Sequence, residues 1–546
     1  MLTRITGGRV IDPANGRDGI ADVWMRDGRI IEAAAGQGRA DATYDAAGKI
    51  VMAGAIDIHS HIAGSNVNTA RLLLPELHCD RSPARGHTPL ANAQSGTFWT
   101  GCRYAEMGFT TVVEPAVAPD YALHAHLELG DIPIIDKAIL TVLGNDDYLL
   151  RLMRSGESAS AVRDYVGWTL ATSRALGIKV INAGGAAAFK ANVRAFSLDD
   201  VVPFYGVTSR AIVNTLQRAV HELGVPHPLH VHCNNLGLAG NAETALATIA
   251  AAEGLPLHLA HLQFYGYGKE GEHGFSSAAA RLAEAVNASK SVTVDVGQVM
   301  FGQTVTVSSD VLRQFNARRQ ASPQKWVIFD GDANGGGVVP YNYRSTDFYN
   351  AVQWCVGLEL FLLIDDPGRV FFTTDHPNGA PFTAYPELFA LLMDRELRAQ
   401  WLARLPPAVQ PVTTLASIKR EYSLTEIATM TRAAPAKLLG LADRGHLGAG
   451  AIADVAVYAD EADRARMFRA ASLVFKDGDL VVRDGEVTRY CWGRALTVAP
   501  GHDRAIERRM RDYYFDRYGL PPELVAAVPS AAIGRADAFE LVPCAS

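Results

Sequence analysis

The chain has 546 residues, of which 48% are hydrophobic and 20% are charged, and its net charge is −7. This length exceeds one ordinary hydrophobic core, so we expect at least two domains. The sequence has neither a basic stripe typical of nucleic-acid binding nor an apolar run long enough to span a membrane. The six cysteines are scattered without a Cys-x-x-Cys pair, and the N-terminus lacks a signal-peptide pattern. We therefore expect a cytoplasmic protein without disulfides or cysteine-bound metal, and with neither nucleic acid nor membrane as a partner.

The two ends of the chain read as small β-structures. Residues 1–52 contain alternating apolar stretches and an Asp-Gly hairpin signal at Asp27–Gly28, and residues 445–499 contain similar stretches with two more Asp-Gly turns. Because chain ends tend to lie close together, we expect residues 1–52 and 445–499 to form one composite β-sandwich subdomain. Residues 500–546 are predicted to add a C-terminal extension, with a helix and a tail.

The middle of the chain, residues 53–444, alternates apolar strands with helices. Helical segments such as 95–108, 157–177 and 241–254 separate the strands. This alternation predicts an α/β fold with a TIM-like (β/α)8 barrel. A long insert, residues 298–368, is expected to form a lid or a contact with another subunit, and its Gly-rich loop 331–340 lacks the Lys-Ser or Lys-Thr of a phosphate cradle. The eight strand candidates are 55–61, 109–117, 132–140, 177–183, 228–234, 255–264, 291–297 and 369–376.

The first strand candidate ends in a His-x-His pair, His59 and His61. Alternate residues of a strand project from the same face, so both imidazoles should share one side with Asp57. Two imidazoles that converge at a strand end can chelate one divalent metal ion. Taken alone, the pair could equally be two core or surface histidines, because the chain has 16 histidines.

Lys179 lies within the fourth strand candidate, between Ile178 and Val180. A buried, unpaired ammonium group tends to lose its proton. The resulting neutral amine can react with carbon dioxide to give a carbamate, which can bridge two metal ions. The alternative is an ordinary lysine whose amine reaches solvent from a strand edge.

Strands five, six and eight also carry histidine or aspartate near their ends. His230 and His232 share a face, so either could bind metal; His232 lies nearer the strand end and is favoured. His258 and His261 are expected to point to opposite faces, with His261 nearer the end. Asp375 ends strand eight, where the alternative is a cap for the following helix.

The order of His59-x-His61, Lys179, His232, His261 and Asp375 on strands one, four, five, six and eight resembles the amidohydrolase superfamily. The segments AEMGFTTVVE and APAKLLGLADRGHLGAGAIADVAVY are similar to it as well. Five further blocks resemble a narrower branch, the A subunits of formylmethanofuran dehydrogenases and, most of all, of bacterial formyltransferase/hydrolase complexes. These blocks are KIVMAGAIDIHSHIAGSNVN, GIKVINAGG, HVHCNNLG, HLQFYGYG and FFTTDHPNG.

The resemblance implies a centre with two zinc ions, although the same ligands would accept other divalent metals. His59, His61 and Asp375 would hold one ion, His232 and His261 the other, and Lys179, N6-carboxylated by carbon dioxide, would bridge them. Asp375 and His232 would be the catalytic residues, with Asp375 moving a proton from the attacking water to the leaving amine. Contacts to the substrate or to the metal ligands are expected from Asp57, His230, Asn234 and Asn235.

The implied reaction is the hydrolysis of N-formylmethanofuran to formate and methanofuran in one-carbon (formaldehyde) oxidation. The expected partners are two further subunits besides a formyltransferase subunit. One alternative is an amidohydrolase for another small linear or cyclic amide, dihydropyrimidinase-like or aminoacylase-like, which would differ only in the loops at 64–95 and 298–345. Another is a non-catalytic scaffold subunit, but scaffolds usually lose ligands and all six candidates are present.

Overall fold

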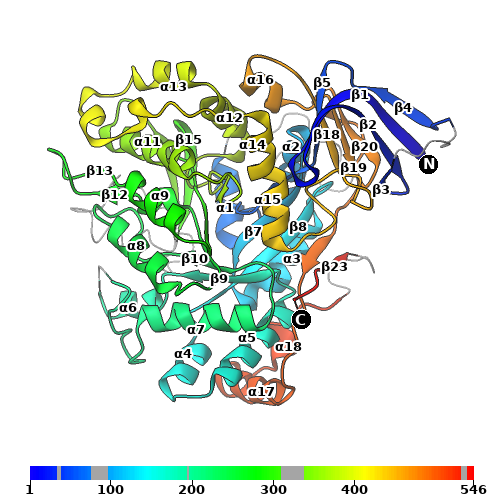
Figure 1. Cartoon of the computed structure of the whole chain (residues 1–546). Coiled ribbons are helices and arrows are strands. Elements are labelled where there is room, and N and C mark those ends of the chain that lie inside the picture. Colours follow the sequence, from blue (N-terminus) through cyan, green and yellow to red (C-terminus); the bar gives the residue numbers. More distant parts are fainter. Residues whose placement is uncertain (33–38, 75–95, 194–195, 309–336, 531–537, 546) are drawn as a thin grey trace.

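The computed structural model describes residues 1–32, 39–74, 96–193, 196–308, 337–530 and 538–545. Eight strands at its centre pair in chain order, each parallel to the next (Figure 1). A parallel bridge between Ser60 and His376 joins the last strand to the first. This arrangement confirms the predicted α/β fold with a (β/α)8 barrel. The barrel strands are β6 (Ala55–Asp57), β7 (Phe109–Val117), β8 (Asp136–Leu143), β9 (Gly177–Ile181), β10 (Leu229–His232), β11 (Leu257–Leu259), β14 (Val292–Asp295) and β17 (Val370–Phe371).

Helices connect successive barrel strands and cover the outside of the barrel (Figure 1). Because the strands are buried by these helices on one face and by the barrel interior on the other, they read as nearly continuous apolar runs. The helices between strands are α1 (Ser65–Leu73), α2 (Thr97–Glu106), α3 (Ala122–Gly130), α4 (Asp147–Arg154), α5 (Ala159–Ser173), α6 (Gly185–Lys190), α7 (Ser209–Glu222), α8 (Ala242–Ala251), α9 (Ala279–Ala288) and α11 (Phe348–Leu363). After β17 follow α12 (Tyr385–Met393), α13 (Arg395–Leu402), α14 (Leu424–Ala428) and α15 (Ala434–Leu439).

Most barrel strands are shorter than predicted at their carboxyl ends. Strand β7 has the predicted bounds, whereas β6, β11 and β17 stop early. Beyond β11 and β17 the backbone turns, because His261 (φ 34°) and Asp375 (φ 52°) adopt left-handed conformations. Strand β8 begins later than predicted because Ile134, at φ 69°, interrupts the extended backbone. His261 and Asp375 are therefore placed by turns rather than by regular strand alternation.

The two chain ends form a second, smaller sheet beside the barrel. Strand β5 is parallel to β1 and antiparallel to β18, so early and late segments of the chain lie side by side (Figure 1). All nine strands pair in one continuous sheet. They are β1 (Leu2–Asp12), β2 (Arg17–Arg26), β3 (Arg29–Ile31), β4 (Ala42–Asp45), β5 (Lys49–Ala53), β18 (Val455–Ala459), β19 (Leu473–Lys476), β20 (Asp479–Arg483) and β21 (Glu486–Val487), with α16 (Arg464–Arg469) between β18 and β19.

Buried ion pairs join this sheet to the barrel. The ammonium group of Lys476, on β19, lies 3.0 Å from Asp136 of β8 and 2.8 Å from Asp454. The guanidinium of Arg444 lies 2.9 Å from the same Asp136 carboxylate. Burial raises the pKa of Asp136, but Lys476 and Arg444 outweigh burial and hold that pKa well below its usual value.

The structure departs from the predicted boundaries in two places. Strand β22 (Ala495–Thr497) pairs with β8 of the barrel and with β23 (Phe539–Leu541), so residues 495–497 leave the small sheet that we expected to extend to 499. The extension also contains α17 (Ala505–Tyr518) and α18 (Pro522–Val525). The predicted insert includes α11, which is the ordinary connection between β14 and β17.

The rest of that insert contains the antiparallel hairpin of β15 (Gly302–Ser308) and β16 (Gly337–Tyr343). A shorter hairpin joins β12 (Tyr267–Gly268) and β13 (Ser276–Ser277). Residues 75–95 and 309–336, which include most of the Gly-rich loop, lie outside the described residues. Across the described ranges, no helix is both long and apolar enough to cross a membrane.

Candidate metal centre

His59, His61 and Asp375 converge at the carboxyl end of the barrel. Oδ1 of Asp375 lies 3.1 Å from Nε2 of His59 and 3.3 Å from Nε2 of His61. Among the described residues this buried oxygen has no well-aligned hydrogen-bond partner. Ligand atoms around a tetrahedral zinc ion are about 3.3 Å apart, given bonds of about 2.0–2.1 Å. The triad thus has the spacing and the unsatisfied acceptor that a metal ion would need.

A second pair of imidazoles lies beside this triad. Nδ1 of His232 is 3.1 Å from Nε2 of His261, and Nζ of Lys179 is 3.2 Å from Nε2 of His59. The structure therefore brings all six predicted metal ligands together, five of them around one cavity of about 420 Å³. His59 is fully buried at the base of the site. The five cavity-lining ligands are His61, Lys179, His232, His261 and Asp375.

Strand register explains why His232 rather than His230 reaches the cavity. His230 pairs with Lys179 on one side and with His258 on the other, and His232 lies two residues nearer the carboxyl end. Our expectation that His258 and His261 point to opposite faces is wrong. Strand β11 ends at Leu259, and the left-handed turn at His261 brings that side chain back to the barrel axis beside His232.

Two of the candidate ligands, Lys179 and His61, have shifted pKa values that bear on metal binding. Burial lowers the pKa of Lys179 to about 8, although nearby carboxylates, Asp375 foremost, raise it. Burial would lower the pKa of His61 too, but Glu114 and Asp375 outweigh burial and raise that pKa to about 9. Metal ions bind deprotonated ligands, so binding at this site would displace protons.

The other predicted site residues lie outside the cavity lining. Asp57 accepts hydrogen bonds from the hydroxyl of Tyr104 (2.8 Å) and the backbone N–H of His59 (3.0 Å), beneath the metal ligands. Asn234 donates to Ser209 (3.0 Å), and Asn235 accepts from the backbone of Phe196 (3.1 Å). These bonds hold the segment that follows β10.

Two buried carboxylates that sequence reasoning missed contact the first histidine pair. Glu114 of β7 lies 3.1 Å from Nδ1 of His61 and accepts the backbone N–H groups of Ile62 (2.6 Å) and Ala63 (3.0 Å). Asp295 of β14 lies 3.0 Å from Nδ1 of His59. Each is an acidic residue inside an apolar strand, which is the same signal that singled out Lys179.

The cavity walls extend well beyond the ligands. Polar groups come from α1, η4 (Pro119–Tyr121) and the β15–β16 hairpin, and apolar groups come from the loops after β10 and β11. The cavity can therefore enclose a ligand larger than a formyl group. The non-ligand wall residues include Asn66, Val67, Asp120, Tyr121, Leu236, Phe264, Thr306, Val307, Gln353 and Asn378.

Comparison with known proteins gives full-length matches. The chain is 53% identical to the A subunit of the formyltransferase/hydrolase complex Fhc of Methylorubrum extorquens, over 100% of both chains. It is 39% identical to "Protein FwdA" of Methanocaldococcus jannaschii, over 93% of this chain and 94% of that one. The crystal structure of the M. extorquens complex FhcABCD with methylofuran contains a chain that superposes with a TM-score of 0.93, at 53% identity and full coverage of both chains.

A family model described as "Amidohydrolase family" matches residues 42–489, which include the barrel strands and strands β4, β5 and β18 to β21 of the small sheet. The six converging ligands lie within this range: Lys179 and His232 are on β9 and β10, and the other four follow the ends of β6, β11 and β17. This chain therefore belongs to the amidohydrolase family.

Proposed function

We propose that this protein hydrolyses N-formylmethanofuran, or its methylofuran counterpart, to formate and the free amine. It would act as the hydrolase subunit of a complex with a formyltransferase and two further subunits, in one-carbon oxidation in the cytoplasm. The observation that carries the proposal is a complete set of six candidate ligands, five of which line one cavity, in a chain 53% identical over its full length to the A subunit of the Fhc complex. The crystallised relative belongs to a complex that contains methylofuran.

We further propose two zinc ions as the resident metals. His59, His61 and Asp375 would hold one, and His232 and His261 the other. Lys179, carboxylated by carbon dioxide, would contribute one oxygen to each ion; its buried amine lies among these ligands. When bound, the ions would supply Lewis acidity that polarises the formyl carbonyl and makes water a better nucleophile.

In this proposal Asp375 transfers the proton of the reaction. In the hydrolysis a C–O bond forms from water, the C–N bond breaks, and the nitrogen must gain a proton because a free amide anion is a poor leaving group. One carboxylate oxygen of Asp375 faces the imidazoles, and the other accepts a hydrogen bond from Asn378 (2.9 Å). The carboxylate can accept a proton from water and return it to nitrogen.

The test is formate release by the purified four-subunit complex, together with metal analysis. We expect two metal ions per chain and turnover of formylmethanofuran but not of a hydantoin. Hydantoin turnover without formate release would favour a cyclic-amide hydrolase. A complex with less than one metal per chain and no turnover of either amide would favour a scaffold.

A further inference from the structure

Asp295 is a buried carboxylate that contacts one metal ligand of each predicted ion. It ends β14, the seventh barrel strand, and is 0% exposed. Its Oδ2 lies 3.0 Å from Nδ1 of His59, and its Oδ1 accepts the backbone N–H of His261 at 2.6 Å. His59 belongs to the first ligand set and His261 to the second.

We propose that Asp295 is a positioning residue that holds His59 and His261 in the geometry needed to bind both ions. The inference rests on the two-metal centre of the proposed function. Nε2 of His59 faces Asp375 and Lys179, so this nitrogen must be the metal-binding one. The ring proton then resides on Nδ1 and is donated to Asp295, which selects that tautomer and fixes the ring plane.

The contact to His261 constrains the backbone rather than the ring. His261 has a left-handed backbone conformation (φ 34°), which residues other than glycine adopt infrequently. Its N–H bond to Asp295 ties this turn to β14. Gly297, two residues further along, packs directly against the Cα and Cβ of His261 and leaves no room for a side chain there. Asp295 thus holds the turn by a hydrogen bond to its backbone, and Gly297 holds it by close packing.

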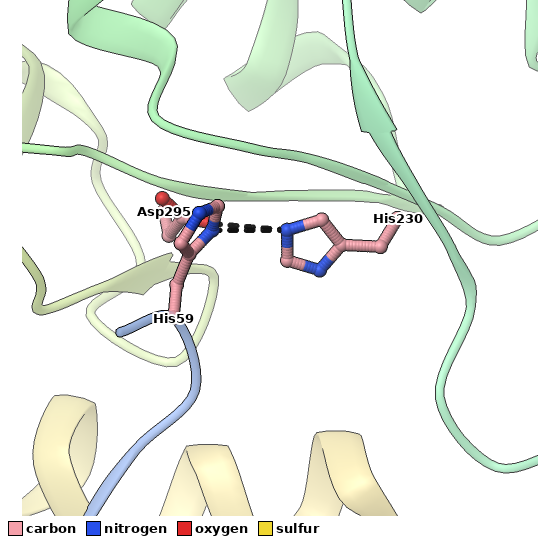
Figure 2. A group of neighbouring side chains, drawn as sticks. All are labelled: His59, His230 and Asp295. Atoms are coloured by element: carbon pink, nitrogen blue, oxygen red, sulfur yellow. Dashed lines mark hydrogen bonds and ion pairs between the residues drawn. The ribbon is translucent and has the colours of Figure 1, made fainter. Parts of the chain in front are cut away.

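His230 and His258 complete the surroundings of Asp295. In Figure 2 the ring of His230 points at His59, and Asp295 lies beside the His59 ring. Nε2 of His230 is 3.1 Å from Nδ1 of His59, and Nε2 of His258 is 3.0 Å from Asp295. The ligand atoms of His59, His230 and Asp295 lie within 4.8 Å of one another, a spacing that could also suit an ion.

A third ion at that position would compete with the first. It would need Nδ1 of His59 as a ligand while Nε2 binds the first ion, so the ring would have to lose both protons. The alternative needs no such loss, because a hydrogen-bond network is already present: Nδ1 of His230 is 3.0 Å from His227, and Nδ1 of His258 is 2.8 Å from the hydroxyl of Thr293. We therefore assign these residues to support of the centre rather than to a further metal site.

The decisive variant is Asp295→Asn, which conserves shape. All three side-chain and backbone groups assigned to Asp295 donate hydrogen bonds, so the new NH₂ group must face at least one donor. If the NH₂ group faces His59, it favours the tautomer with the proton on Nε2, and a protonated Nε2 cannot bind metal. If the NH₂ group faces His261, two hydrogen-bond donors oppose each other. We expect affinity to fall about 10- to 100-fold for at least one ion, the first if the NH₂ group faces His59 and the second if it faces His261.

The measurement is competition with a chelator, for zinc and for cobalt(II), with the cobalt absorption bands reporting ligand geometry. Glu114→Gln is the comparison, because Glu114 contacts His61 and should weaken only the first ion. Glu359→Gln is the control: Glu359 is equally buried, on α11, but is bonded to Thr414 (3.0 Å) away from the centre, and both affinities should stay at the wild-type level. A third bound ion in the wild type would overturn the assignment.

Wild-type affinities and cobalt spectrum in a folded Asp295→Asn variant would also overturn it. If that variant does not fold, Thr293→Val replaces it, because this change keeps Asp295 and removes only the hydroxyl that orients His258. We then expect a smaller loss at both ions, and wild-type affinities would refute the proposal. Failure of the proposed function is a separate result, since it would appear as a wild-type complex that binds two ions but releases no formate.

Discussion

Replacement of Asp375 by Asn, measured in excess zinc, should separate proton transfer from binding of the metal. Asn378 donates to Oδ2 of Asp375 at 2.9 Å. In Asp375→Asn the amide oxygen must keep that bond, because an NH₂ group there would face another donor. The amide nitrogen then replaces Oδ1, which lies 3.1 Å from His59 and 3.3 Å from His61. The variant loses both the proton acceptor and the negative ligand of the first ion.

The expected loss of rate follows from the role of the carboxylate. A positioned general acid–base group contributes about 10²- to 10⁴-fold. At about 1.36 kcal/mol per factor of ten, this corresponds to roughly 2.7–5.4 kcal/mol of barrier. We expect kcat for formate release to fall by at least about 10²-fold even when zinc is supplied in excess, because added metal restores the ion but not the proton acceptor.

The assay is steady-state formate release by the complex in excess zinc, with metal content measured on the same samples. Asn378→Ala is the matched variant, because it removes the hydrogen bond to Oδ2, together with the acceptor of the Val307 N–H, but keeps the carboxylate; its loss of kcat should be smaller. A near-normal kcat in Asp375→Asn with two bound ions would refute the reasoning and remove Asp375 from proton transfer.

Three other changes test separate parts of the structure. Lys179→Ala should leave fewer than two ions per chain by metal analysis and abolish formate release, and two retained ions with activity would reveal another bridging ligand. Gly297→Ala should displace His261, since an added Cβ would meet its Cα and Cβ, and should weaken the second ion more than the first in chelator competition. Asp136→Asn should destabilise the fold by roughly 3 kcal/mol at pH 7 in urea unfolding, because it removes a buried negative charge that pairs with both Lys476 and Arg444. Since the folded pKa of Asp136 is depressed, this difference should persist above the usual value of 3.8 and shrink as the pH falls below it; a constant difference would contradict the ion-pair assignment.

Local pattern was sufficient for the elements of the barrel. Strand β7 has its predicted bounds because residues 109–117 are apolar or β-branched except for Glu114, with α2 before them and η4 and α3 after them. The His-x-His pair and Lys179 were recognisable because imidazoles and an amine inside apolar strands require a chemical reason. The amidohydrolase resemblance then supplied the grouping of ligands around two ions.

Other features depend on contacts between distant segments. Strand β22 joins the barrel sheet because it pairs with β8, more than 350 residues earlier in the chain, as the 358-residue separation of the Arg494–Asp136 bond shows. The direction of His261 follows from a left-handed turn, which strand alternation does not predict.

The sequence by itself determined the fold class, the order of the barrel strands and the six candidate ligands, because hydrophobic periodicity and residue chemistry are local properties of the chain. Only the tertiary structure decided which carboxylates support those ligands. Glu114 lies on β7 and meets His61 from the neighbouring strand, whereas Asp295 lies on β14 and meets His59 across the barrel interior. The first contact needs the pairing of β6 with β7, and the second arises only when the barrel closes, since closure brings side chains from distant strands to one axis and leaves each buried charge to find a partner there.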